Sequence, residues 1–471
     1  MNSSSIIIPN VHDYVRRGMD PSFPERLLAE WRDIASGFSE VSLFWEGNDK
    51  LVLSPREINK NFISYIKGLL GYENLLVLVP RSYTSDFCDD ILGDETLFSK
   101  IVDYSMDSRI PHILSWGATE TIYLLLNKLQ NYGANFLSQE LPDRNNYWTS
   151  LYFDSKAGFR ELCSKLQQFD SQIQIPQGFA CGSLNEALEI LRWFYSHRTP
   201  CVIKASSGVS GFGNVFIYGD SFEKTFKDVA SYVKNSIQEL PYFTSDIIIV
   251  EEMVISNPLK LKNSCICSNS PFMSGFISPD GEMKIIGGGI DIRNEQCYYV
   301  GAELGKEGEF SKVSDVLNPI MYKIGKAISE YGYRGHWGVN FVLSKRGMPI
   351  AIELNARRCG ESHVYAIAKR IYGEEWIKLC YAITRFPYYI QPAPDVSIDS
   401  ILHIFERTNA VYKKDDVMAI PTQVSWLHQK YPGIGYVLFG PNKSLVKSTE
   451  EFLLNQFLNV GIKGINGQHP N

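Results

Sequence analysis

The sequence lacks the features that mark several large classes of protein. Its 471 residues contain no apolar run close to the roughly eighteen residues of a membrane-spanning helix. The amino-terminal stretch has no basic end followed by a long apolar segment, so it does not resemble a signal peptide. The 9 cysteines are scattered and include no C-x-x-C pair, which argues against a structural zinc site. We therefore expect a soluble, cytoplasmic protein with reduced thiols.

The sequence also lacks an excess of positive charge. Its 46 basic and 52 acidic residues give a formal net charge of -6. Proteins that bind nucleic acid usually present a basic face, so we expect no nucleic-acid partner, and the missing apolar runs predict no membrane partner. Apolar residues make up 44% of the chain and charged residues 21%. This composition is typical of a folded globular protein.

The length predicts more than one domain, because a single hydrophobic core stops growing at about 250 to 300 residues. The apolar run at 75–79 indicates a buried strand of a parallel sheet covered on both faces. Further along, strands such as 247–250 alternate with helical patterns such as 319–331. We expect this helix to begin with Asn318 as its N-cap and Pro319 in its first turn. We predict an α/β (α+β) fold divided into domains at 1–150, 151–385 and 386–471.

Two β-hairpins are predicted in the middle of the chain. Asp280 and Gly281 lie between apolar runs, and such a pair supplies the positive φ angles of a tight turn. The second hairpin joins the segments 338–344 and 349–355 through four residues that include Gly347.

The second hairpin predicts a cluster of oxygen ligands. If Ser344 pairs with Pro349, Asn340 lies opposite Glu353, and Asn355 joins the same face by the two-residue strand period. Carboxylate and amide oxygens suit a hard cation such as magnesium. A solvated hairpin face with ordinary polar residues is equally compatible with this motif alone.

A strand candidate at 201–204 ends in Lys204 and continues into a loop rich in serine and glycine. Glycine lets backbone N–H groups approach an anion closely, so the loop predicts a phosphate cradle. It is not a P-loop, because no Gly-Lys-Ser/Thr follows it. A surface turn behind an edge strand is the alternative. The loop residues in question are Ser207, Gly208, Ser210, Gly211 and Gly213.

Charged residues follow two other strand candidates. Glu251 ends the strand at 247–250, a pattern that more often marks a strand reaching water than a ligand site. Arg357 and Arg358 follow Asn355 after one intervening residue, where guanidinium groups can neutralise phosphate or oxyanion charge. The functional interpretation of both arginines depends on the predicted metal site.

Taken in order, these segments resemble the ATP-grasp superfamily, whose members carry an early lysine, a strand-borne lysine before a glycine-rich loop, a carboxylate-bearing hinge and a terminal E-x-N. The early lysine matches Lys156, and the second matches Lys204. The resemblance implies an ATP-grasp fold in which both lysines contact the ATP phosphates and the glycine-rich loop covers them. It also implies that Glu251 and the backbone near Val254 receive the adenine.

The same resemblance implies the metal ligands and the catalytic groups. Glu353 and Asn355 match the E-x-N and would bind magnesium, and Asn340 stands where many members have a carboxylate. Three further residues are candidates for contacts with the transferred phosphate, with the tetrahedral intermediate and with the amine proton, respectively: Arg357, Arg293 and Glu361.

Nearly the whole chain is also similar to a narrower group, the pheganomycin-type peptide ligases with a pre-ATP-grasp domain. The segments 79–81 and 109–114, together with Asp86, resemble the amino-terminal α/β domain of that group, and 433–439 resembles its small carboxy-terminal domain. The resemblance implies an enzyme that uses ATP and Mg²⁺ to activate a small carboxylate as an acyl phosphate. An amine or peptide acceptor would then attack it to form an amide or peptide bond.

Three questions stay open. The first is the reaction: an amino-acid ligase without a peptide acceptor and a nucleotide-binding protein that has lost catalysis are the alternatives to a peptide ligase, the second suggested by Asn340. The identity of the two substrates does not follow from residue spacing. A homodimer is one assembly that we consider.

Overall fold

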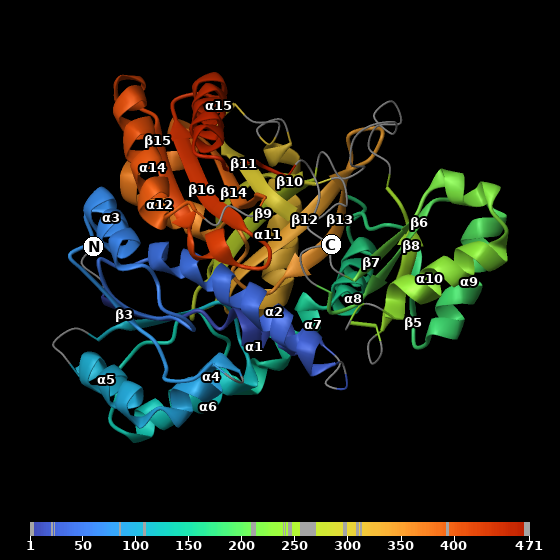
Figure 1. Ribbon diagram of the computed structural model, residues 1–471. Helices are drawn as coiled ribbons and strands as arrows, with labels where there is room; N and C mark the ends of the chain where they lie inside the picture. The colour runs from blue at the N-terminus through green and yellow to red at the C-terminus, as the bar shows by residue number, and fades with distance from the viewer. Residues whose placement is uncertain are drawn as a thin grey trace.

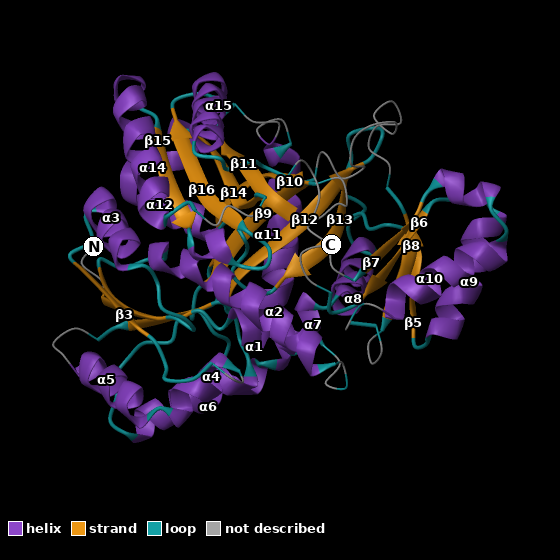
Figure 2. Ribbon diagram, viewed as in Figure 1, coloured by secondary structure: helices purple, strands orange, loops and turns teal. Residues whose placement is uncertain are grey.

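The computed structural model describes residues 4–19, 22, 24–83, 86–106, 110–208, 213–238, 240, 242–243, 247–254, 270–294, 299–307, 310, 313–391 and 395–465. Within these ranges the strands form three sheets, and helices pack against them (Figure 1 and Figure 2). Among the helices of these ranges, none is both long enough and apolar enough to cross a membrane.

The amino-terminal part of the chain builds a parallel sheet. Its strands are β1 (Ser4–Ile8), β2 (Asp49–Leu53), β3 (Asn74–Leu78) and β4 (His112–Ser115). Its helices are α1 (Val11–Arg16), α2 (Glu25–Phe38), the 3-10 helix η1 (Ser39–Phe44), α3 (Lys60–Leu70), α4 (Phe87–Gly93), α5 (Glu95–Met106) and α6 (Glu120–Asn131). The strand order is β3-β2-β1-β4. Parallel neighbours need crossover connections, which these helices supply.

The strand predicted at 75–79 is present as β3 in the parallel sheet, but it is not covered on both faces. It lies at the edge, beside β2 alone. Leu75 is 8% exposed and Leu76 is 42% exposed. An edge strand that packs on one face needs only every second side chain to be apolar, so the continuous run overstated its burial.

The middle of the chain builds a smaller antiparallel sheet. Its strands are β5 (Gly178–Cys181), β6 (Cys201–Ala205), β7 (Asn214–Ile217) and β8 (Ile248–Glu252), in the order β5-β8-β6-β7. The neighbouring helices are η2 (Arg144–Asn146), α7 (Trp148–Asp154), α8 (Lys156–Gln167), α9 (Leu184–Ser196), η3 (Gly219–Glu223) and α10 (Phe226–Gln238). Helices α9 and α10 cover this sheet (Figure 1) and contribute Leu191 and Val233 to its core.

The third sheet is antiparallel and is the largest of the three. Its strands are β9 (Pro271–Ile277), β10 (Met283–Arg293), β11 (Tyr299–Gly305), β12 (Gly335–Leu343), β13 (Pro349–Asn355), β14 (Tyr381–Tyr389), β15 (Met418–Gln423) and β16 (Gly433–Gly440). The helices around it are α11 (Ser314–Glu330), α12 (Ser362–Tyr372), α13 (Trp376–Leu379), α14 (Ile398–Tyr412), η6 (Lys413–Asp415), η7 (Ser425–His428) and α15 (Lys443–Asn459). The order is β13-β12-β9-β10-β11-β14-β16-β15.

This sheet continues from the middle of the chain into its carboxy-terminal part. The predicted boundary at 385/386 falls inside β14, and the one at 150/151 falls inside α7. The division into three domains therefore stays a prediction.

One hydrophobic core joins the two ends of the chain. It contains Ile7 and Phe62 from the amino-terminal part together with Tyr436 and Phe439 from β16, all fully buried. A buried charge network lies in the same contact region. The guanidinium of Arg358, 1% exposed, donates to carboxylates of the amino-terminal part, Glu46 at 3.1 Å and Glu140 at 2.6 Å. These hydrogen bonds connect the amino-terminal part to Arg358, the residue next to the catalytic candidate Arg357.

The start of α11 differs from the prediction. The helix begins at Ser314, with Val313 as N-cap, and Pro319 lies inside it rather than in its first turn. The first turn of the helix lies before the proline and contains Asp315, whose negative charge is favourable at a helix N-terminus. Proline there removes one backbone donor, and the buried apolar face, which includes Leu317 and Ile320, stabilises the helix across it.

Candidate active site

The hairpin predicted from the glycine-containing loop is present as β12 and β13, and it pairs Asn340 with Glu353 as expected. The predicted four-residue loop is one residue too short, because Ser344 also belongs to the turn. Leu343, not Ser344, is the last residue paired with Pro349. The predicted register at the site is right although the predicted register at the turn is wrong.

A β-bulge explains this result. The register shifts between Asn340 and Phe341, because Phe341 pairs with Ala351 while Asn340 pairs with Glu353. Ile352 is the extra residue on β13, and it compensates for the additional residue in the turn. Bulges of this kind are frequent beside active sites, where they redirect a side chain.

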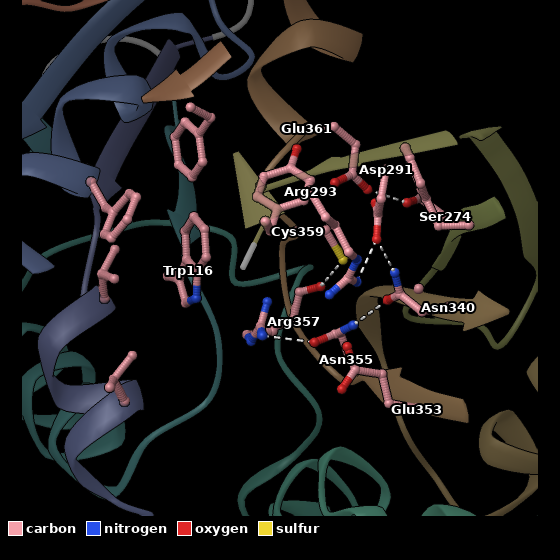
Figure 3. A pocket seen from close by; sticks show the side chains of 18 of the residues that line it. Trp116, Ser274, Asp291, Arg293, Asn340, Glu353, Asn355, Arg357, Cys359 and Glu361 are labelled. Atoms are coloured by element: carbon pink, nitrogen blue, oxygen red, sulfur yellow. Dashed lines mark hydrogen bonds and ion pairs between the residues drawn. The ribbon is translucent and has the colours of Figure 1, made fainter. Parts of the chain in front are cut away.

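The amide groups of this face form a directed chain of hydrogen bonds. Asn355 Nδ2 donates to Asn340 Oδ1 at 3.0 Å, and Asn340 Nδ2 donates to Asp291 Oδ2 at 3.1 Å (Figure 3). The same Asp291 oxygen accepts from Arg293 Nη2 at 2.6 Å. Amide and carboxylate oxygens from three strands thus lie together on one side of a cavity.

Asp291 was missed by the sequence analysis. It is 5% exposed and lies two residues before Arg293 on β10. The two-residue strand period gives it the same face as Arg293, and this period was the signal that could have identified it. Its carboxylate lies beside the neutral amide of Asn340. Asn340 is the position at which many ATP-grasp proteins have a carboxylate.

The carboxylate of Glu353 lies among cations. Its nearest charged neighbour is Lys156, whose Nζ is 3.6 Å from Glu353 Oε2. Burial alone would raise the pKa of Glu353, but Lys156, Arg293, Lys204 and Arg357 together lower it below its ordinary value. Glu353 is therefore ionised at neutral pH, the form in which it can hold a cation.

Lys156 stands at the start of α8 and is buried. Its Nζ donates to the carbonyl oxygen of Gly208 at 2.6 Å, and its backbone N–H donates to the carbonyl oxygen of Ser206 at 2.9 Å. Ser155 caps the helix by accepting from the N–H of Gly158 at 3.0 Å. The cap and the backbone bond together place the lysine against the loop that follows β6.

Lys204 is paired with Glu251 across neighbouring strands. Both side chains are buried, and Lys204 Nζ forms an ion pair with Glu251 Oε1. The other oxygen of Glu251 accepts from Arg160 Nη1 at 2.9 Å, so one carboxylate balances two cations. Arg160, four residues after Lys156 on the same helix, is a further charged residue that the sequence analysis missed. Val254, half-buried, lies two residues beyond the end of β8.

The glycine-rich loop is described only at its two ends. Ser207, Gly208 and Gly213 lie in the described residues, whereas Ser210 and Gly211 lie outside them. Gly213 has a φ of +87° and accepts from the N–H of Ala205 at 2.8 Å. A Cβ added at Gly18, after α1, would come within 2.7 Å of Ser207 Cβ. The end of α1 therefore contacts the beginning of this loop.

Arg357 lies beyond the E-x-N at the end of β13. Its Nη2 donates to Asn355 Oδ1 at 2.7 Å, and its Nε is 4.0 Å from Asp154 Oδ1. Asp154 also accepts from the N–H of Ala356 at 2.7 Å. Asp154, not singled out in the sequence, thus fixes both the backbone and the side chain around Arg357.

Glu361 and Arg293, the other two catalytic candidates, both lie away from the surface. Glu361 is 4% exposed and accepts from Ser274 Oγ at 2.7 Å. Burial raises the pKa of Glu361 to about 7, although the Ser274 hydrogen bond opposes the shift. A carboxyl group with this pKa exchanges a proton near neutral pH.

The raised pKa of Glu361 predicts a pH-dependent stability. The native state holds the proton more tightly than the unfolded chain, whose ordinary value is 4.5, so stability is lost as pH rises from there to about 7. Relative to wild type, Glu361→Gln is expected to be equally stable at about pH 4 and more stable by about 3 kcal/mol at about pH 8. Urea unfolding at both values measures the difference, and Glu330→Gln, at an exposed position of α11, is the matched control. A constant difference between Glu361→Gln and wild type would contradict the raised pKa.

These groups line one continuous cavity. On its polar side lie Asp291, Arg293, Asn340, Glu353 and Asn355, while Trp116 lies beyond Arg357 in the view of Figure 3. Lys156 reaches the same region from α8, with Nζ 3.6 Å from Glu353 Oε2, and Lys204 on β6 is among the cations that lower the pKa of Glu353. The predicted metal ligands and all three catalytic candidates are therefore brought together, whereas Glu251 lies in the smaller sheet with Lys204.

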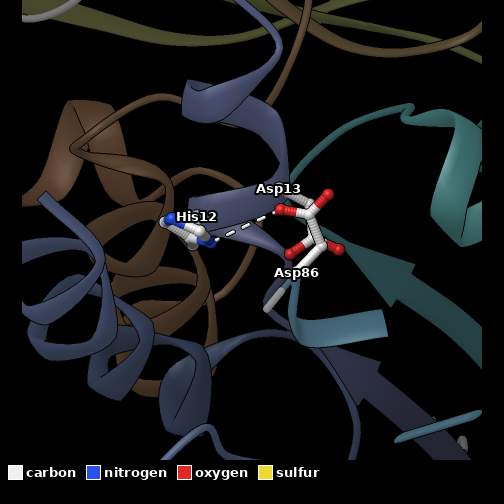
Figure 4. A group of neighbouring side chains, drawn as sticks. All are labelled: His12, Asp13 and Asp86. Carbon is white, nitrogen blue, oxygen red and sulfur yellow. Dashed lines mark ion pairs between the residues drawn. The ribbon is translucent and has the colours of Figure 1, made fainter. Parts of the chain in front are cut away.

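A second group of potential ligands lies in the amino-terminal part. His12, Asp13 and Asp86 face one another (Figure 4). Both oxygens of Asp13 already accept from the backbone, from Phe87 N at 2.6 Å and Cys88 N at 3.1 Å, and so cap α4. Burial and nearby arginines lower the pKa of His12 to about 4. The same arginines would repel a metal ion at this place. We therefore explain the group by the capping of α4 and not as a metal site.

Comparison with known proteins identifies the fold to which this site belongs. No family model matches the chain. The L-propargylglycine--L-glutamate ligase of Streptantibioticus cattleyicolor is 24% identical over 243 residues, which are 49% of this chain and 46% of that ligase. The chain thus matches about half the length of this curated relative.

Solved structures match over nearly the full length. The ADP complex of purK, an N5-carboxyaminoimidazole ribonucleotide synthetase, has a TM-score of 0.54 at 12% identity and covers 98% of both chains. Biotin carboxylase from Campylobacter jejuni, solved with β-γ-ATP, has a TM-score of 0.56 at 11% identity, with 98% of this chain and 92% of that chain covered. The biotin carboxylase domain of Hydrogenobacter thermophilus 2-oxoglutarate carboxylase, solved with MgADP, has a TM-score of 0.51 at 11% identity and covers 99% of this chain and 91% of that chain. These are ATP-grasp proteins, and this chain has the ATP-grasp fold.

Proposed function

We propose that this protein is an ATP-dependent ligase that joins a carboxylate to an amine through an acyl phosphate, forming a peptide or amide bond and releasing ADP and phosphate. The observation that carries the proposal is the ionised Glu353 in the cavity, with the buried Lys156 ammonium 3.6 Å from its carboxylate and the buried Lys204 among the cations that lower its pKa. The curated relative supports it, since its name describes the joining of two amino acids.

In this proposal ATP lies between the smaller sheet and the largest one. Lys156 and Lys204 bind its phosphates, and the glycine-rich loop from Ser207 to Gly213 covers them. Glu251 and the backbone at Val254 receive the adenine. Two structural relatives were solved with ADP, and one with an ATP compound, which supports a nucleotide at this place.

The donor set fits magnesium. Glu353, Asn355 and Asn340 would hold it, because they offer one carboxylate and two amide oxygens, and Mg²⁺ is often bound by one or two carboxylates together with substrate phosphates. Asp291, hydrogen-bonded to Asn340 at 3.1 Å, brings a second carboxylate to the site. When bound, the ion would neutralise phosphate charge.

The remaining charged groups act on the transferred phosphate and on the amine. The substrate carboxylate attacks the γ-phosphate of ATP, ADP leaves, and the amine then displaces phosphate from the acyl phosphate. Arg357 neutralises the transferred phosphate, and Arg293 steadies the tetrahedral intermediate. Glu361, with a pKa of about 7, accepts the proton that the amine loses. No protein nucleophile is needed.

An inactive nucleotide-binding protein is the second candidate, because Asn340 is neutral. The Asp291 carboxylate beside it favours the ligase, since the site retains a second negative oxygen donor. An amino-acid ligase without a peptide acceptor differs from the first candidate only in its substrates.

The test is ADP release on addition of acids and amines. The full chain with ATP and Mg²⁺ is incubated with pairs of amino acids, other carboxylates, amines and short peptides, and the products are identified by mass spectrometry. We expect ADP, phosphate and an amide in equal amounts. Tight ATP binding without any ADP release over the panel would favour the inactive alternative.

A further inference from the structure

One wall of the cavity is apolar and does not take part in the chemistry proposed above. It is formed by the helices α1 and α2 of the amino-terminal part. The residues of α2 recur at i, i+3, i+4 and i+7, and those of α1 at i and i+4, so each helix turns one face to the cavity. The residues are Trp31, Ile34, Ala35 and Phe38 on α2, and Val11 and Val15 on α1.

This wall is only partly covered by protein. Val15, Trp31, Ile34 and Phe38 keep intermediate exposure while lining the cavity. Aromatic rings close other sides of the same space, with the ring of Phe386 at 4.9 Å from that of Phe38. A half-exposed apolar concavity continuous with convergent polar groups is the usual form of a small-molecule site.

The charges at the inner end of the wall are of both signs. The guanidinium groups of Arg293 and Arg357 line the cavity, and both side chains are 11% exposed. The carboxyl group of Glu361 lines it as well. The cavity thus combines partners for a carboxylate, a partner for an amine and a surface for an apolar side chain.

We infer that one substrate of this site is an α-amino acid with an aliphatic or aromatic side chain, which packs against α1 and α2. The inference rests on the proposed ligase function and adds the substrate class to it. As the acceptor, the amino acid presents its amine to Glu361 and its carboxylate to Arg293, while Arg357 remains with the transferred phosphate. Val15 and Ile34 exclude polar side chains because they offer them no hydrogen-bond partner.

Amino-acid binding tests the inference. Titration calorimetry on the full chain with Mg²⁺ and ADP compares L-leucine with L-asparagine, whose side chain has the same shape but is polar. L-phenylalanine, 4-methylpentanoate and 3-methylbutylamine complete the set, the last two lacking the amine and the carboxylate of leucine. We expect L-leucine or L-phenylalanine to bind at least roughly tenfold more tightly than L-asparagine and than either truncated analogue.

Two substitutions assign this preference to the wall. Val15→Thr and Ile34→Asn keep the side-chain size close to wild type while adding polar atoms, and each is expected to reduce the preference for leucine over asparagine by roughly tenfold. Val316→Thr, at a valine of α11 that is 51% exposed, is the matched control and leaves the preference unchanged.

The outcomes separate the two proposals. A preference for asparagine, equal binding of both, no binding of leucine and phenylalanine, or an unchanged preference in both wall variants would overturn the inferred substrate class. Apolar amino-acid binding without ADP release on any acid and amine would leave the substrate class supported and overturn the ligase function instead.

Discussion

Replacing Glu353 by glutamine is expected to reduce kcat for ADP release by about a thousandfold. The neighbouring cations hold the pKa of Glu353 below its ordinary value, so the wild-type side chain carries a full negative charge in the working pH range. Glutamine keeps the shape and one oxygen but loses this charge. Magnesium would then be held weakly, and the Lys156 ammonium at 3.6 Å would lose its carboxylate partner.

The measurement is a coupled assay of ADP over a range of Mg²⁺ concentrations. Glu330→Gln serves as the control for the same chemical change, since the Glu330 side chain is 66% exposed on α11. Asp291→Asn is a useful companion, because it should raise the Mg²⁺ concentration needed for half-maximal rate. Wild-type turnover in Glu353→Gln at low Mg²⁺ would exclude this glutamate from the metal site.

Replacing Lys204 by methionine is expected to weaken ATP binding and also to destabilise the fold. The substitution leaves Glu251 buried with Arg160 as its remaining cation, at 2.9 Å. Breaking a buried ion pair costs about 3 to 5 kcal/mol, and the retained Arg160 should bring the loss to about 2 to 4 kcal/mol. Nucleotide affinity should fall by about a hundredfold, because a charge-assisted contact to phosphate is lost.

A double variant separates the two effects. In Lys204→Met with Glu251→Gln the buried carboxylate has been neutralised together with its lysine partner, so the free energy of unfolding should recover part of its wild-type value. The recovery is partial because Arg160 keeps its carbonyl acceptors but loses its carboxylate. ATP affinity, measured by calorimetry, should remain low. Recovery of ATP affinity together with stability would mean that Lys204 acts only by supporting the fold.

Much of the site followed from local spacing. Lys204 ends a strand before a glycine-rich loop, and Glu353 and Asn355 share a face two residues apart, so each could be recognised within one short segment. The pairing of Asn340 with Glu353 was also predicted, although the turn was misplaced, because the bulge compensates for the extra loop residue. A bulge depends on how side chains pack across the whole sheet, and hairpin counting does not contain that information.

The missed residues act across long separations. Asp291 reaches Asn340 from a strand that is not adjacent to β12, at a sequence separation of 49 residues. Arg160 reaches Glu251 across 91 residues. Such contacts arise from sheet order, which single-sequence patterns do not fix. The edge position of β3 was missed for the same reason, since a run of apolar residues does not tell which strands lie beside it.

The core that joins both ends of the chain has a consequence for engineering. A fragment beginning at residue 151 would lose the carboxylate of Glu140 and the one at Glu46, leaving the buried guanidinium of Arg358 without these acceptors. It would also bare the apolar surface of β16 around Tyr436 and Phe439 to water. Exchanging amino-terminal parts between proteins of this fold therefore requires redesign of this contact region, and we expect a fragment cut at a sequence boundary alone to be insoluble.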